Sequence, residues 1–165
     1  MTKYKMVWIF LIAVFLVCDP AIAKTVHDVL VKKVIDGDSI LVSNGTKDIK
    51  IRLWGIDTPE YRQPYSKAAK KITKKILLHE LVDLEVKDID KYGRTVALVR
   101  TKNGENVNEL LVRSGYAWVH IYYCKEPICK TWKVYESEAR EKKIGLWREA
   151  NPVAPWIWKR KYKNR

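Results

Sequence analysis

The chain has 165 residues and carries 32 Lys and Arg against 19 Asp and Glu, which gives a formal net charge of +13. This length suits one domain, and 47% hydrophobic residues can fill a core, so the composition excludes global disorder, while a single long apolar run excludes a polytopic membrane protein. The positive charge favours polyanionic partners, of which nucleic acid is the commonest, with anionic membrane surfaces and glycans as alternatives.

The apolar run lies at the start of the chain and is typical of a secretory signal peptide. Lys3 and Lys5 precede the uncharged residues 6–18, and the small-residue triplet Ala21-Ile22-Ala23 follows. A helix of that length rises about 20 Å, short of a hydrocarbon core of about 30 Å. We therefore expect cleavage after residue 23 and export to the periplasm or the external medium; an uncleaved membrane anchor is the alternative.

Three strands are expected next, over residues 29–35, 39–43 and 48–54. The dipeptide Asn44-Gly45 predicts a hairpin turn between the second and third strands, because both positions tolerate positive φ. The third strand alternates cleanly. Its apolar face carries Ile49, Ile51 and Leu53, and its other face carries Lys50, Arg52 and Trp54.

The chain then alternates helices and strands. A helix is expected over residues 64–79, where apolar residues recur at helical spacing: Tyr65, Ala68, Ala69, Ile72 and Ile76. Strands over 82–86 and 95–101 follow, and then a helix over 106–114 that stops at Gly115. A third helix is expected over 130–143, with Gly145 as its C-cap.

This order predicts an α+β fold, a five-stranded OB-type β-barrel with three α-helices, in a domain over residues 24–150. A basic tail containing Pro and Trp occupies residues 151–165. Because Pro152 and Pro155 disfavour a regular helix, we expect the tail to be extended. Trp156 and Trp158 are expected to pack on the barrel.

Two cysteines, Cys124 and Cys129, remain after the expected cleavage. An exported protein matures in an oxidising compartment, so we expect a disulfide between them. The alternative is a metal site with His120, which lacks a fourth ligand of the usual kind.

Acidic residues gather in two short segments, Asp36-Gly37-Asp38 and Asp57-Thr58-Pro59-Glu60. Each could be an ordinary turn. Because the second and third strands form one hairpin, however, both segments lie at the same end of it. Converging carboxylates repel one another unless a cation is bound, and oxygen ligands suit Ca²⁺ or Mg²⁺. The absence of His and Cys from both segments argues against zinc.

Two arginines complete a possible phosphodiester site. Arg52 lies on the polar face of the third strand, and Arg94 closes the turn before the strand over 95–101. Both could be solvated surface residues. Beside a carboxylate-bound metal, their guanidinium groups would instead bind phosphate oxygens and stabilise transition-state charge, while a remaining carboxylate orients or deprotonates water.

The sequence resembles the staphylococcal nuclease family over nearly the whole chain that remains after the expected cleavage, from about residue 26 to 147. Four motifs carry the resemblance, in family order: Asp36-Gly37-Asp38-Ser39, the run from Arg52 to Glu60, Asp90-Lys91-Tyr92-Gly93-Arg94, and the run from Val107 to Gly115. The resemblance implies an OB barrel and a Ca²⁺-dependent phosphodiesterase that acts on DNA and RNA and leaves 3′-phosphates.

Site roles follow from the same resemblance. Asp38 and Asp57 would be carboxylate ligands to calcium, and Thr58 would add its backbone carbonyl. Glu60 would position or activate the attacking water, and Arg52 and Arg94 would bind the scissile phosphate. Asp36 would lie near the metal without binding it.

Several features have more than one interpretation. Five lysines share one face of the first helix and could be a solvated face or a phosphate track: Lys67, Lys70, Lys71, Lys74 and Lys75. Trp54, Trp118 and His120 are expected to pack rather than to stack on bases or to catalyse. The function expected is an exported monomeric nuclease without stable membrane association; a non-catalytic nucleic-acid-binding module on the same barrel is the alternative.

Overall fold

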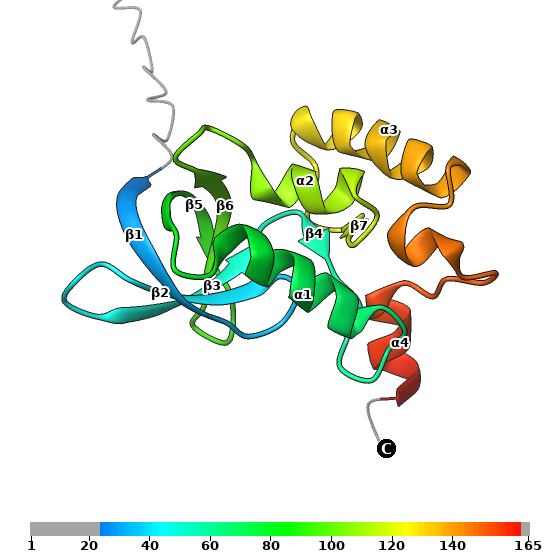
Figure 1. The fold of residues 1–165 in the computed structure, drawn as a ribbon, viewed down its shortest axis with the longest axis horizontal. Helices are drawn as coiled ribbons and strands as arrows, with labels where there is room; N and C mark the ends of the chain where they lie inside the picture. Colours follow the sequence, from blue (N-terminus) through cyan, green and yellow to red (C-terminus); the bar gives the residue numbers. More distant parts are fainter. Residues whose placement is uncertain (1–23, 163–165) are drawn as a thin grey trace, which may run out of the picture.

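Five strands close into a barrel in the spatial order β1-β2-β3-β6-β5 (Figure 1). The structure is a computed structural model that describes residues 24–162. The expected signal peptide, residues 1–23, and the last three tail residues lie outside the described residues. The barrel strands are β1 (Thr25–Val34), β2 (Ser39–Ser43), β3 (Asp48–Leu53), β5 (Leu81–Ile89) and β6 (Thr95–Thr101).

Strand pairing follows the turns expected from the sequence. The β2–β3 hairpin pairs Ser39 with Arg52 and Ser43 with Asp48, and the Asn44-Gly45 turn connects them. The barrel closes through a parallel pairing of β3 with β6, in which Ile51 lies opposite Thr95. The OB-type barrel is thereby confirmed, and its interior consists of fully buried aliphatic side chains such as Val31, Ile40 and Ile51.

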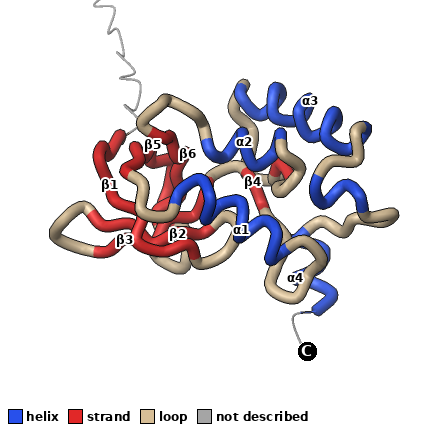
Figure 2. The backbone as a smooth tube through the Cα atoms, viewed as in Figure 1, coloured by secondary structure: helices blue, strands red, loops and turns tan. Residues whose placement is uncertain are grey.

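The helices gather at one side of the barrel. Figure 2 shows α2 (Val107–Arg113), α3 (Ile128–Glu141) and α4 (Pro155–Tyr162) to the right of the strands, with α1 (Ser66–Leu77) crossing the barrel in front. Between them lie the short pair β4 (Ile56–Asp57) and β7 (Trp118–Val119) and the 3-10 helix η1 (Gly145–Arg148). Within residues 24–162, no helix is both long enough and apolar enough to cross a membrane.

The C-terminal tail is helical, so the expectation of an extended tail was wrong. Pro155 is the first residue of α4, where a proline has no helical hydrogen bond to lose and its fixed φ suits the helix. Trp156 packs against the small cluster of Trp118, Trp147 and Ala154. Residues 24–162 therefore contain four α-helices instead of the expected three.

Two other helix boundaries differ from expectation. Tyr65 has a φ of 64° and precedes α1, so that helix starts after it, at Ser66. Gly145 opens η1 instead of capping α3, which ends at Glu141. A Cβ on Gly145 would lie 2.2 Å from the carbonyl oxygen of Gly115, and this close backbone approach explains the glycine.

The Cys124–Cys129 disulfide is present, as expected. It closes the segment between β7 and α3, against Trp132 and the backbone of Gly55. Since both sulfurs are bonded to each other, the alternative of a metal site with His120 is excluded.

Candidate active site

The two acidic turns meet at one end of the β2–β3 hairpin, as the sequence predicted. Asp38 comes just before β2. Asp57 is the last residue of β4, the short strand after β3, and Thr58 follows it. The backbone N–H of Thr58 and its hydroxyl both donate to Asp38 Oδ2, at 2.7 and 2.8 Å. The backbone N–H of Leu53 donates to the carbonyl of Asp38 at 2.8 Å. These bonds fix the first turn against the second.

A glycine allows this close approach. A Cβ at Gly37 would lie 2.6 Å from Thr58 Oγ1 and 3.0 Å from the Cβ of Ala69 in α1. The carbonyl of Gly37 accepts a 2.6 Å hydrogen bond from the buried hydroxyl of Thr73, also in α1. The helix after the third strand therefore holds the first acidic turn in place.

Arg52 lies between two carboxylates and is almost enclosed, with 14% of its side chain exposed. Its Nη2 donates to Asp57 Oδ1 at 2.6 Å, its Nη1 donates to the carbonyl of Leu53 at 2.6 Å, and its Nε lies 3.3 Å from Asp38 Oδ1. Burial alone would lower the pKa of Arg52, but the charges of Asp38 and Asp57 outweigh burial and raise it. The sequence placed Arg52 on the polar face; the structure puts it in direct contact with both aspartates.

The site holds more buried negative charge than Arg52 balances. Burial, and then the charge of Asp38, raise the pKa of Asp57 to about 7 in spite of the bond to Arg52. Asp36 is exposed to solvent, yet the protein around its carboxyl and then the charge of Asp38 raise its pKa as well, to about 6. A bound cation would remove this penalty by stabilising the ionised carboxylates.

The donors fit a hard divalent cation. Asp57 Oδ2 accepts no hydrogen bond from residues 24–162, and the surrounding donors are all oxygens of Asp38, Asp57 and Thr58. In the described part of the chain, no three His, Cys, Asp or Glu side chains are grouped as a metal site. Two carboxylates and the Thr58 carbonyl would hold the ion, which leaves positions for water and phosphate.

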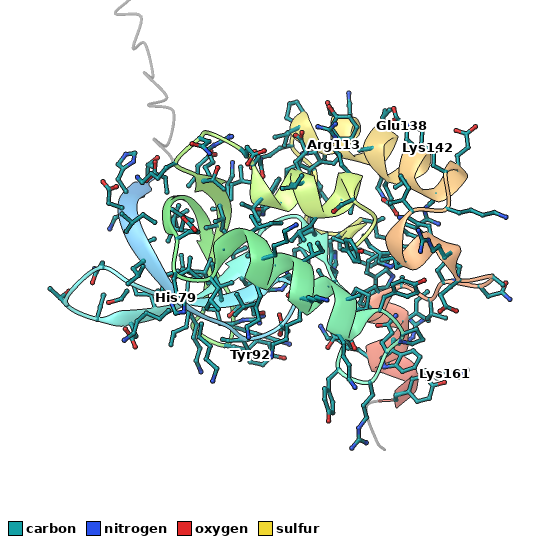
Figure 3. The ribbon with its side chains drawn as sticks, viewed as in Figure 1. His79, Tyr92, Arg113, Glu138, Lys142 and Lys161 are labelled. Atoms are coloured by element: carbon teal, nitrogen blue, oxygen red, sulfur yellow. A yellow bond between two sulfur atoms is a disulfide. The ribbon has the colours of Figure 1, made fainter. Side chains whose placement is uncertain are left out.

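Glu60 and Arg94 lie at the edge of this centre. Glu60 follows Thr58 in the second turn, and 29% of its side chain is exposed. Arg94 is bound by Asp90 through a 2.7 Å Nε–Oδ2 ion pair, and its Nη1 lies 3.5 Å from the hydroxyl of Ser39. Tyr92, labelled in Figure 3, lies in the same β5–β6 turn, with its ring centroid 5.6 Å from the Arg94 guanidinium.

A cavity of about 430 Å³ opens beside the acidic turns. Asp38, Thr58 and Glu60 line one part of it, and Lys67 and Lys70 of α1 line another. The cavity extends from the carboxylates to the basic face of α1. An extended polyanion that lies in this cavity would therefore contact both.

Trp54, Trp118 and His120 have packing roles. The indole of Trp54 lies edge-on to Trp132 with centroids 5.8 Å apart, and that of Trp118 lies edge-on to Trp147 at 4.4 Å. Burial, and then the charge of Arg52, lower the pKa of His120 to about 4, so the ring is neutral at pH 7. A base that weak does not suit proton abstraction at neutral pH.

Three residues that support the site could not be recognised from the sequence: Thr73, Gln63 and Lys159. Thr73 was part of a helix without a role, Gln63 was a loop residue, and Lys159 belonged to the tail. Gln63 is 6% exposed and holds the Glu60 turn, and Lys159 pairs with Glu60 itself. The partners of Thr73, Lys159 and the Gln63 side-chain nitrogen lie 36 or more residues away in the chain, and no local sequence pattern reveals such contacts.

Known proteins match most of the chain. A family model described as "Staphylococcal nuclease homologue" matches residues 50–149. An "Uncharacterized endonuclease" of Escherichia coli O157:H7 is 36% identical over 148 residues, which cover 90% of this chain and 94% of that protein. A "Micrococcal nuclease" of Shigella flexneri is 34% identical over 142 residues, which cover 81% of each chain. The family match includes Arg52, Asp57, Thr58, Glu60 and Arg94.

Proposed function

The chain belongs to the staphylococcal nuclease family and is a nuclease, and we propose that it is an exported, monomeric, Ca²⁺-dependent phosphodiesterase that cleaves DNA and RNA and leaves 3′-phosphate ends. The observation that carries the proposal is the convergence of Asp38, Asp57 and Thr58 around Arg52. It supports a site that combines an oxygen-only cation centre with a fixed guanidinium.

Asp38, Asp57 and the carbonyl of Thr58 hold the cation. When bound, Ca²⁺ supplies charge that neutralises a non-bridging oxygen of the scissile phosphate. Calcium suits this set because it accepts carboxylate and carbonyl oxygens in flexible geometry, whereas Mg²⁺ demands a near-ideal octahedron.

Arg52 binds the phosphate from a fixed position. A guanidinium has five N–H donors, and three nitrogens of Arg52 each direct a contact to Asp38, Leu53 or Asp57. Its two other N–H groups have no partner within residues 24–162 and can donate to phosphate oxygens. Because the other contacts already orient the side chain, little reorganisation is needed as negative charge grows in the transition state.

Arg94 and Glu60 act from the edge of the centre. Arg94 donates to phosphate oxygens from the β5–β6 turn, where Asp90 orients it. Glu60 orients or deprotonates the attacking water through its partly exposed carboxylate. The 5′ oxygen is then the leaving group, and the phosphate stays on the 3′ side.

A plasmid digestion assay tests the proposal. We expect cleavage of DNA and of RNA in Ca²⁺, none in excess chelator, and recovery when Ca²⁺ is added back. Terminal transferase should extend the product ends only after phosphatase treatment, because a 3′-phosphate blocks extension. Undiminished cleavage in chelator would contradict calcium dependence, and direct extension would contradict the cleavage chemistry. Nucleic acid bound but left intact would favour the non-catalytic module.

A further inference from the structure

The C-terminal segment reaches the active site although the family match ends at residue 149. Trp156 of α4 lies edge-on to Trp118 with ring centroids 5.9 Å apart, and its centroid is 5.1 Å from that of His120. Both partners lie in or beside β7, which pairs with β4, the strand that ends at Asp57. The tail is therefore packed on the element that carries the acidic turn.

Gln63 connects the tail to the turn that contains Glu60. Its side-chain nitrogen donates to the carbonyl of Val153 at 2.6 Å, and its side-chain oxygen accepts from the backbone N–H of Glu60 at 2.9 Å. The backbone N–H of Gln63 donates to the carbonyl of Glu60 at 2.8 Å. Because the Gln63 side chain is buried, both of its bonds are shielded from water.

Lys159 then meets the Glu60 side chain directly. It lies in the second turn of α4, and its Nζ is 2.6 Å from Glu60 Oε1. Partial burial opposes the charge of Lys159, but the fields of Asp57 and Glu60 outweigh it and raise the pKa of the ammonium group. Arg52 is bound to Asp38 and Asp57, so Lys159 is the cation that Glu60 pairs with among the described residues.

We propose that α4 is part of the active site and that Lys159 is a positioning residue, which holds the Glu60 carboxylate in the orientation that meets the attacking water. The proposal rests on the role of Glu60 proposed above. The ion pair uses Oε1, and Oε2 accepts no hydrogen bond from residues 24–162, so one oxygen is anchored and the other is available to water.

Positioning explains this geometry better than a purely structural ion pair does. The Lys159 side chain is 57% exposed, and exposed ion pairs contribute little to stability. A partly exposed glutamate without an anchor rotates among several conformers, and few of them place an oxygen near the reacting water. Fixing one oxygen removes that freedom before the substrate binds.

The test compares four single variants in steady-state and single-turnover cleavage at saturating Ca²⁺: Lys159→Met, Lys159→Arg, Glu60→Gln and Arg160→Ala. Methionine keeps an unbranched stem and removes the charge, and arginine restores a charge. Arg160 is the matched control, since it is the next basic residue of α4, is exposed and makes no ion pair with any residue of 24–162.

We expect Lys159→Met to lower kcat by about 10- to 100-fold without a comparable rise in KM, because misplacing a catalytic group costs rate rather than binding. Lys159→Arg should recover most of the rate, and Arg160→Ala should match the wild type. The melting temperature and the calcium dissociation constant should be unchanged in all of them.

A double variant separates positioning from direct phosphate binding. If Lys159 acts through Glu60, adding Lys159→Met to Glu60→Gln should lower the rate little further. Multiplying effects, or a rise in KM alone, would overturn the proposal in favour of direct substrate contact. A rate in Lys159→Met equal to or above the wild type would overturn it too. A fully active Glu60→Gln would instead contradict the proposed function.

Discussion

Arg52 and Asp57 show how single residues define this site. Their 2.6 Å contact satisfies one oxygen of Asp57, and the other oxygen accepts no bond from residues 24–162. The Asp-Gly-Asp and Asp-Thr-Pro-Glu segments could be predicted to converge, because hairpin geometry brings their strands to a common end. The direct contacts of Arg52 could not be predicted, because strand alternation shows which face a side chain occupies but not which residues it contacts.

The raised pKa values of Asp36 and Asp57 predict an unusual pH dependence of stability. In metal-free folded protein these carboxyls have pKa values of about 6 and about 7, against an ordinary value of 3.8. Between about pH 5 and 7.5, the folded state therefore holds more protons than the unfolded state. The free energy of unfolding should fall as pH rises, by up to about 1.4 kcal/mol per pH unit for the buried Asp57. The contribution of Asp36 should be smaller, because this residue is exposed and solvent screens its charge.

Urea unfolding in chelator across that pH range measures this slope. Asp57→Asn removes one titrating group without changing the shape, so it should flatten the slope, and saturating Ca²⁺ should flatten it in the wild type because the ionised forms are then stabilised. An equal slope in the wild type and Asp57→Asn would contradict the account of Asp57.

At the scale of elements, α1 serves both the core and the substrate surface. Ala69, Thr73 and Leu77 are buried, and Thr73 bonds the first acidic turn. The opposite face carries five exposed lysines, of which Lys67 and Lys70 line the cavity beside the acidic turns. This geometry favours a phosphate track over a merely solvated face.

Charge reversal on α1 tests the track. Lys70→Glu with Lys74→Glu should flatten the salt dependence of nucleic-acid binding in chelator, by up to about 2 units in the slope of log K against log salt. Lys130→Glu with Lys142→Glu makes the same charge change on α3 and its C-cap residue, and should flatten the slope less. Equal slopes for both pairs of substitutions would indicate that the α1 lysines are a solvated face and do not bind phosphate.

Local sequence patterns predict some of the helices and strands but not others. Strands, the Asn44-Gly45 turn and three helices were recognised from periodicity and turn chemistry, which act over a few residues. Helix α4 was not predicted, because Pro152 and Pro155 disfavour a helix when they lie in its interior. Pro155 is instead the first residue of α4, a position where a helix tolerates proline. Strands β4 and β7 have two residues each, too few for any periodicity.

At the scale of the whole molecule, the tail, the disulfide and the barrel form one structure around the site. Gln63 and Val153 are 90 residues apart in the chain yet share a hydrogen bond, and Cys124 and Cys129 close the segment between β7 and α3. The barrel could be inferred from strand number and order. The docking of the tail could not, because it depends on tertiary contacts alone.

Thiol titration tests the disulfide and export together. The mature protein should show no free thiol, because cleavage after residue 23 removes Cys18 and the remaining pair is bonded. Reduction should expose two thiols per chain and lower the free energy of unfolding by about 2 kcal/mol or less, with activity kept below the new melting point. One free thiol in non-reduced exported protein would mean that Cys18 is retained. Two would mean that Cys18 is removed but no disulfide forms, and three would mean that Cys18 is retained and no disulfide forms.

The single-turnover cleavage rate as a function of Ca²⁺ concentration distinguishes the calcium ligands from the arginine that stabilises the transition state. Asp38→Asn removes the charge of a ligand, so its midpoint should move to higher Ca²⁺. Arg94→Ala removes a transition-state donor, so its midpoint should stay while its plateau falls by at least about 10²-fold. Circular dichroism should show both variants folded. An unshifted midpoint in Asp38→Asn, or a full plateau in Arg94→Ala, would place the chemistry on other residues.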